Sequence, residues 1–184
     1  MEYLKNQILI SMPHMIDPIF SKAVIYICDH NSQGAMGLII NKRIETTKLN
    51  LIFKKNPTNQ GTKQVSLKDL FLGGPVLIEN GIVLHHNSLK SNDAFSISNT
   101  ISITSKQDDL ITLQSKQNIP FKVMMGHCGW APAQLEKEIE NGDWLMQNTT
   151  DDFIFNIPPA QMWDQATSSL GIELENFIND VGIS

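Results

Sequence analysis

A histidine and a cysteine stand side by side between two glycines in the segment MMGHCGWAPAQLE, residues 124–136. Such a pair suits three roles: an activated thiol, part of a metal site, or a small side chain that fills a tight turn. The apolar run ends at Gly126, and Pro132 begins a helical pattern. We therefore expect a strand, a turn and a helix in this order, with Cys128 at the bend.

The residues around this cysteine argue against a hydrolase of the Ser-His-Asp type. Trp130 stands where the Gly-x-Ser-x-Gly turn of α/β-hydrolases has its last glycine. No histidine follows His127, so the chain order nucleophile, acid, histidine is impossible, although other orders remain open. His127 is a poor base for Cys128 because neighbours on a strand point to opposite faces. Amides at a helix N-terminus would lower the pKa of the thiol, so a catalytic or redox-sensing Cys128 is the alternative to the expected small packed residue.

Metal and phosphate sites are the next possibilities. The histidines and cysteines that come into question as metal ligands are Cys28, His30, His85, His86, His127 and Cys128. The chain has no Cys-x-x-Cys or His-x-x-x-His pair, the spacings typical of structural zinc sites. The turn Gly73-Gly74-Pro75 also lacks the glycine patterns of nucleotide-binding loops. We therefore expect no metal and no other cofactor, and we assign no catalytic residue.

Acidic residues alternate along the expected helix after Pro132. They are Glu136, Glu138 and Glu140, with Asp143 beyond. On a helix, residues four apart share a face, so 136 and 140 lie together and 138 points elsewhere. We expect a solvated helix face here rather than an acid–base pair.

The composition is that of a packed globular chain. Its 184 residues, 41% hydrophobic and 18% charged, suit one domain with its own core. The net charge of −5 and the lack of a dense Lys/Arg cluster predict no direct binding to nucleic acid. No apolar run approaches the roughly 18 residues that span a bilayer, and the first residues lack the pattern of a secretory leader. We expect a cytoplasmic protein that does not enter a membrane.

Turn residues divide the chain into short apolar segments. Residues 24–29 are expected as a central strand covered on both faces, paired antiparallel with 36–41. Residues 54–64 contain no large apolar side chain and are expected as a mobile loop. Together the segments predict a single α+β (mixed α/β) domain over residues 1–184, with helices against a mixed sheet. Further strands are expected at 7–11, 82–86, 94–98, 101–104, 121–125 and 143–147, an extended piece at 153–155, and helices at 47–53, 108–117, 132–141, 159–169 and 174–180.

Four groups of residues in combination resemble the AlgH/YqgE family of bacterial proteins, from about residue 4 to residue 166. They are Met12-Pro13 with Asp17-Pro18 and Phe20, His30-Asn31 with Gly34-Ala35-Met36-Gly37, Leu72-Gly73-Gly74-Pro75, and Gly129-Trp130 with Gln134-Leu135-Glu136. The family usually has Tyr at His127, Ala or Ser at Cys128, Gly at Ala133 and Glu at Asp29. The resemblance implies a strongly bent, mixed but largely antiparallel sheet flanked by helices. It implies no established reaction, although one branch is named for transcriptional regulation of exopolysaccharide synthesis.

Two functional hypotheses follow. The preferred one is a non-enzymatic cytoplasmic protein with an indirect role in transcriptional regulation, which binds an unknown partner protein or small ligand. The alternative is an enzyme or ligand-binding protein with a site where the loops near 12–18, 29–35, 72–76 and 126–132 converge. The candidate pocket residues are His14, Asp17, His30, Asn31, Gly73, Gly74, His127, Cys128, Gly129 and Trp130.

Overall fold

The computed structural model describes residues 3–44, 70–89, 91, 93–116 and 118–171. The helices expected at 47–53 and 174–180 and the mobile loop expected at 54–64 lie outside these residues. Within them, the strands are β1 (Gln7–Ser11), β2 (Val24–Asn31), β3 (Gly34–Ile39), β4 (Leu70–Leu72), β5 (Val76–His86), β6 (Phe95–Ser96), β7 (Ile101–Thr104), β8 (Phe121–Trp130) and β9 (Trp144–Asn148), and the helices are α1 (Gln107–Ser115), α2 (Gln134–Glu140), α3 (Asp151–Asn156) and α4 (Pro159–Ser169).

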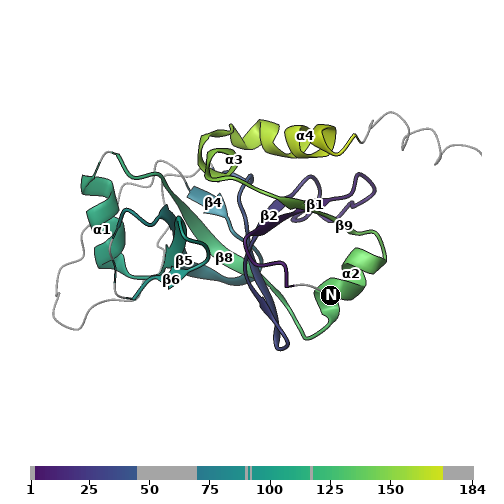
Figure 1. The fold of residues 1–184 in the computed structure, drawn as a ribbon, viewed down its shortest axis with the longest axis horizontal. Coiled ribbons are helices and arrows are strands. Elements are labelled where there is room, and N and C mark those ends of the chain that lie inside the picture. Colours follow the sequence, from purple (N-terminus) through teal and green to yellow (C-terminus); the bar gives the residue numbers. More distant parts are fainter. Residues whose placement is uncertain (1–2, 45–69, 90, 92, 117, 172–184) are drawn as a thin grey trace, which may run out of the picture.

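One curled sheet organises the molecule (Figure 1). The strand order is β6-β7-β5-β8-β3-β2-β1-β9, and β4 adds to β8 outside this path. The pairings are antiparallel except β4 with β8, which is parallel. Helices α3 and α4 lie over one side of the sheet, whereas α1 and α2 lie at its two ends. The predicted α+β fold with a bent, largely antiparallel mixed sheet is confirmed.

Strand β8 joins the two halves of the sheet, and it bends at Gly126. Residues up to Met125 pair with β4 and β5, whereas Cys128 to Trp130 pair with β3. Gly126 has φ +64°, and a Cβ there would lie 2.5 Å from the carbonyl oxygen of Gly74. Only glycine adopts this conformation at such close approach without strain. The strand therefore turns from one half of the sheet to the other without breaking.

The apolar pattern of β2 predicted a strand that is covered on both faces, and the structure confirms this. Val24, Tyr26 and Cys28 belong to the cluster under α3 and α4, whereas Ile25 and Ile27 belong to the cluster that packs against α2. A third cluster packs α1 against the other half of the sheet through Leu110 and Leu113. Each helix thus buries its apolar side on a strand surface, as layered α+β folds require.

Three expectations about the second half of the chain were wrong. The strand expected at 121–125 continues to Trp130, so residues 126–129 form no turn. The helix expected from Pro132 begins at Gln134. The piece at 153–155 is not extended but lies in α3, where the Thr150 side chain accepts a hydrogen bond from the N–H of Phe153. An N-cap threonine followed by two aspartates favours this short helix over the extended state.

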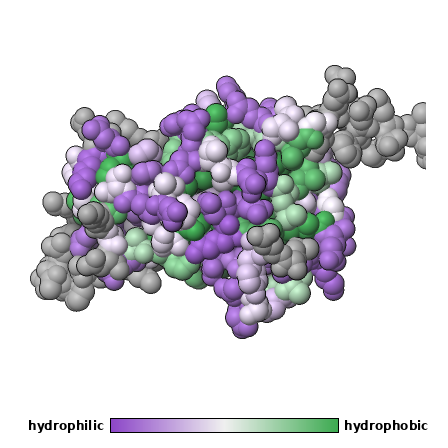
Figure 2. Space-filling view, in the orientation of Figure 1, coloured by the Kyte–Doolittle hydropathy of each residue, from purple (hydrophilic) through white to green (hydrophobic). Residues whose placement is uncertain are grey.

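The surface is mixed in polarity. On the face shown in Figure 2, hydrophilic side chains dominate the centre, and hydrophobic ones are exposed between them and beside α4. The large apolar side chains that are exposed in the described residues are Tyr3, Ile16, Val76, Leu77, Ile78, Phe95, Met146 and Leu170. No helix in the described ranges combines the length and the apolar character that crossing a membrane requires.

Candidate functional site

A pocket of about 450 Å³ opens where the end of β8, helix α2 and the start of β9 meet two loops. One loop joins β1 to β2, and the other leads into β5. Three aromatic and three acidic side chains line it: Phe20, Trp130, Trp144, Asp17, Glu138 and Asp143. We call it the tryptophan pocket. Its size falls within the range of small-molecule sites.

Glu138 is the central polar group of this pocket. Its Oε2 accepts hydrogen bonds from the indole Nε1–H of Trp130 at 2.8 Å and of Trp144 at 2.9 Å. Its Oε1 accepts one from the side-chain amide of Gln134, one helical turn earlier, at 2.9 Å. The two indole rings meet edge to face, with centroids 6.5 Å apart. Because a carboxylate strengthens each of these bonds, Glu138 fixes both tryptophans and ties α2 to the sheet.

The local sequence explains how α2 comes to lie here. Ala133, just before the helix, has φ +61°, and the backbone N–H of Ala131 donates to the side-chain oxygen of Gln134 at 3.0 Å. The helix ends before Gly142, which has φ +80°. That left-handed glycine is the common stop signal, as the sequence predicted. The buried Leu135 anchors the middle of the helix to the core.

A buried histidine provides a second anchor for α2. The backbone N–H of Leu4 donates to Nδ1 of His30 at 3.0 Å, so the ring proton lies on Nε2. This Nε2 is 3.1 Å from Oε1 of Glu136 and donates to it. The Glu136 backbone amide, and then His30, lower the pKa of the Glu136 carboxyl. His30 is therefore a structural residue of β2 that links the N-terminal segment to α2.

The remaining acids make the pocket mouth negative. Asp17 accepts the backbone N–H groups of Ile19 and Phe20 at 2.8 and 3.0 Å, which fixes the loop before β2. Asp143 lies 3.9 Å from Nε2 of the exposed His14. No lysine or arginine lines the pocket among the residues that the structure describes. Glu138 and Asp143 thus belong to the site, not to the solvated helix face that the sequence suggested.

Cys128 lies in the continuous strand β8 rather than at a helix N-terminus. Its side chain is buried, and its Sγ is 3.5 Å from the carbonyl oxygen of Gly73. Burial raises the pKa of the Cys128 thiol to about 12, which agrees with the expected small packed residue and not with the alternative of a thiol activated by helix amides. His127 pairs with Val76, and burial lowers its pKa. The thiol is therefore protonated at neutral pH and packs as a small apolar group.

The glycines of this region have different tasks. Gly73 donates to the carbonyl of Met125 at 2.8 Å, and a Cβ at Gly74 would lie 2.3 Å from the carbonyl carbon of His127. These two let backbones approach closely behind the pocket. At Gly129, which lines the pocket, a Cβ would meet only Val76 Cγ2, at 3.9 Å. Gly129 therefore contributes its backbone to the pocket wall, and its close surroundings do not require a glycine.

The structure brings together four of the ten candidate residues in the pocket wall: Asp17, Cys128, Gly129 and Trp130. His14 lies next to the wall through Asp143. The other candidates do not line it: His30, Asn31, Gly73, Gly74 and His127. The lining residues that were not among the candidates are Met15, Phe20, Pro75, Val76, Gln134, Glu138, Asp143 and Trp144. A usable signal was the pair of tryptophans on either side of the acidic helix, because buried indole N–H groups need acceptors.

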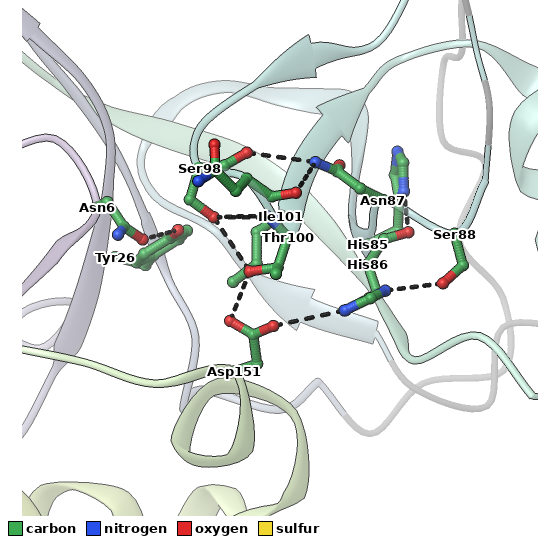
Figure 3. A network of polar contacts seen from close by, with 11 residues as sticks. Asn6, Tyr26, His85, His86, Asn87, Ser88, Ser98, Thr100, Ile101 and Asp151 are labelled. Carbon is green, nitrogen blue, oxygen red and sulfur yellow. Dashed lines mark hydrogen bonds and ion pairs between the residues drawn. The ribbon is translucent and has the colours of Figure 1, made fainter.

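A second polar cluster joins the two halves of the sheet to α3 (Figure 3). Asp151 at the start of α3 accepts the hydroxyl of Thr100 at 2.9 Å and lies 3.5 Å from Nε2 of His86. The neighbouring His85 donates through Nδ1 to the carbonyl oxygen of His86, and its buried Nε2 has no hydrogen-bond partner among the residues that the structure describes. Burial lowers the pKa of His85. Within the described part of the chain, no three His, Cys, Asp or Glu side chains gather as a metal site would require.

Comparison with known proteins places this chain in a family. Residues 8–175 match the family described as AlgH-like. A UPF0301 protein of Pseudoalteromonas translucida is 37% identical over 183 residues, which cover 99% of each chain. A UPF0301 protein of Buchnera aphidicola is 38% identical over 172 residues, covering 91% of this chain and 90% of that one.

Two solved structures have the same architecture. The solution structure of the AlgH protein from Pseudomonas aeruginosa has a TM-score of 0.71 at 29% identity and covers 99% of this chain and 96% of that one. The crystal structure of protein DIP2367 from Corynebacterium diphtheriae has a TM-score of 0.70 at 19% identity, covers 92% of this chain and 88% of that one, and shows the fold alone. From the family match and the relatives, the chain belongs to the AlgH-like family.

Proposed function

We propose that this chain is a non-enzymatic recognition protein whose tryptophan pocket binds a cationic group, and that it acts in the cytoplasm as an indirect regulator of transcription. The observation that carries the proposal is the acidic wall in which Asp17 and Asp143 stand with the Glu138 carboxylate, which Trp130 and Trp144 hold in place. Clustered carboxylates attract ammonium and guanidinium groups, because they place negative potential on the cation. The lining residues contribute three acids and no lysine or arginine from the described chain.

Binding is favoured over catalysis by the state of the polar groups. Three hydrogen bonds from described residues, Trp130, Trp144 and Gln134, hold the Glu138 carboxylate in a fixed position. The Cys128 thiol has a pKa of about 12 and is no nucleophile at neutral pH. A recognition site needs just such fixed groups, whereas general acid–base chemistry needs groups that titrate near neutrality.

An indirect role in regulation fits the charge of the chain. DNA affinity comes mainly from the neutralisation of phosphates by lysine and arginine. The sequence carries 14 such residues against 19 acids, for a net charge of −5. A regulatory effect would therefore pass through a ligand or partner bound in the pocket, not through contact with DNA.

The indole signals in an NMR spectrum test this proposal. The chain has three tryptophans, and each gives one N–H signal. Titration with n-butylammonium or guanidinium is expected to shift the signals of Trp130 and Trp144. The signal of Trp163 should stay unchanged, because its N–H donates to the carbonyl of Ser11 away from the pocket. Butyrate, which has the opposite charge, should shift none of them.

Asp143→Asn provides a matched variant for the site. It removes one of the three acids of the pocket wall and keeps the size of the side chain, so the variant is expected to fold. The loss of this negative charge should weaken the shifts caused by the cations, whereas Glu140→Gln, outside the pocket on α2, should not. If cations and butyrate shift the indole signals equally, or if Asp143→Asn responds like the parent chain, the proposal is wrong.

A further inference from the structure

We propose that the natural occupant of the tryptophan pocket is a lysine or arginine side chain of a partner protein, presented by a peptide segment with aliphatic residues beside it. This inference rests on the proposed function and adds a second surface to it. The aliphatic residues of the peptide would dock on an apolar rim that flanks the pocket, made of Ile16, Val76, Leu77 and Ile78.

All four residues of the rim are large, apolar and exposed to solvent. Ile16 is 92% exposed, Leu77 62%, Ile78 46% and Val76 39%. Ile16 stands between Met15 and Asp17, which both line the pocket, and Val76 lines it directly. The rim residues therefore approach the pocket from two loops. Large exposed apolar side chains gathered at the edge of a pocket and bordered by polar groups are typical of an interaction site.

The backbone at Leu77 supports a functional reading of the rim. Leu77 has φ +49°, a conformation that glycine and asparagine accept more readily than leucine. The chain bulges here, because Val76 pairs with His127 and the next pair joins Gly81 to Met125. A strained residue that turns a large apolar side chain to solvent is not explained by packing within the chain. Such outliers point to a role at a binding surface.

Charge and shape together select the occupant. The three acids of the pocket, Asp17, Glu138 and Asp143, complement a positive group. Its aliphatic stem can pack on the part-exposed apolar side chains of the wall, Met15, Phe20 and Val76. A free small cation would satisfy the pocket but leave the rim exposed to water. A peptide with a basic side chain between aliphatic ones covers both surfaces at once. A second copy of this chain is disfavoured as the occupant by the repulsion of two chains of charge −5.

The test compares one peptide with a small cation. The peptide Ac-GLKLG-NH2 is titrated against the full chain alongside n-butylammonium, with the indole signals of Trp130 and Trp144 as the readout. We expect the peptide to bind at least about tenfold more tightly than n-butylammonium. The peptide with norleucine in place of lysine should lose binding. The peptide with glycine in place of both leucines should fall to the affinity of the small cation.

Variants of the rim separate this inference from the proposed function. Leu77→Asn removes the apolar side chain while suiting the left-handed backbone, so the fold should be kept. The double variant with Ile16→Ser is expected to bind the peptide no more tightly than n-butylammonium. Its affinity for n-butylammonium should equal that of the parent chain. Leu170→Ser, an exposed leucine at the end of α4, is the control and should change neither.

The outcomes are distinct. If n-butylammonium binds but the peptide binds no more tightly, the inference is overturned and the proposed function stands. If neither shifts the two indole signals, both are overturned. If sedimentation shows that the chain self-associates, and Leu77→Asn returns it to the monomer, the rim is an interface between copies and the inference is overturned.

Discussion

The indole N–H groups of Trp130 and Trp144 donate to one and the same carboxylate oxygen, at 2.8 and 2.9 Å. Trp130 ends β8 and Trp144 begins β9, and three strands, β3, β2 and β1, lie between them in the sheet. Glu138 on α2 thus bridges two strands that do not pair with each other. Stability and ligand binding both depend on this bridge, because it shapes the pocket and anchors the helix.

Replacing Glu138 by glutamine tests the bridge. The amide supplies one oxygen acceptor where the carboxylate has two, and its NH2 group would face a donor. We expect the free energy of unfolding in urea to fall by about 2 kcal/mol, since hydrogen bonds to charged groups contribute about 1.5–3 kcal/mol. The indole signals of Trp130 and Trp144 should move, but not that of Trp163.

Glu140→Gln is the matched control for this change. Glu140 lies on the same helix, is exposed and does not line the pocket. A surface change of this kind is expected to alter the stability by no more than about 0.5 kcal/mol. If Glu138→Gln and Glu140→Gln lowered the free energy of unfolding equally, the bridge would contribute no more to stability than an exposed side chain does.

The buried His85 predicts a loss of stability in mild acid. Burial lowers its pKa below the ordinary value of 6.5, so the unfolded chain takes up a proton before the folded chain does. The stability contributed by neutral His85 is present above pH 6.5 and falls as the pH drops below it. His85→Leu should flatten the dependence of the unfolding free energy on pH between 8 and 5. His127, whose pKa is also lowered, should supply the slope that remains.

A change that removes no titrating group serves as the control for this pH dependence. Leu84→Val, at the buried neighbour of His85, should lower the free energy of unfolding and leave the slope unchanged. An identical pH profile for His85→Leu and the parent chain would contradict the assignment.

Ala133 predicts a stabilising substitution. This residue has φ +61° and ψ +4°, the left-handed region, where an L side chain is strained. Glycine, which the family resemblance implies at this position, removes that strain. Because glycine also makes the unfolded chain more flexible, we expect a net gain of about 0.5 kcal/mol for Ala133→Gly, measured by urea unfolding. Gly142→Ala, at φ +80°, should be destabilising for the opposite reason, and a gain there would refute the argument.

The two cysteines are expected to resist thiol reagents. Both are buried, and burial raises the pKa of each thiol above its ordinary value. The folded chain should therefore react with a disulfide reagent at pH 8 far more slowly than the chain in denaturant, since the thiolate is the reacting form. Rapid modification of one thiol in the folded chain would revive a redox role for Cys128.

Local patterns predicted the elements whose signals lie within a few residues. The apolar run of β2 indicated burial on both faces, Pro159 marked the first residue of α4, and Gly142 marked the end of α2. The local patterns gave a wrong prediction at Gly126. The residues around it indicate a turn, yet Gly126 is a bend inside β8, because β8 pairs with β5 before this residue and with β3 after it.

The sequence by itself determined the family, the apolar segments of the sheet and the small residues that let backbones approach, because these depend on residue type and short spacing. Only the tertiary structure decided the pocket. Helical periodicity shows that Glu138 leaves the face shared by Glu136 and Glu140, but not what it meets. Trp130 and Trp144 reach it through pairings of β8 with β3 and of β9 with β1. Such long-range pairings are fixed by the cooperative burial of the whole sheet, which no local pattern contains.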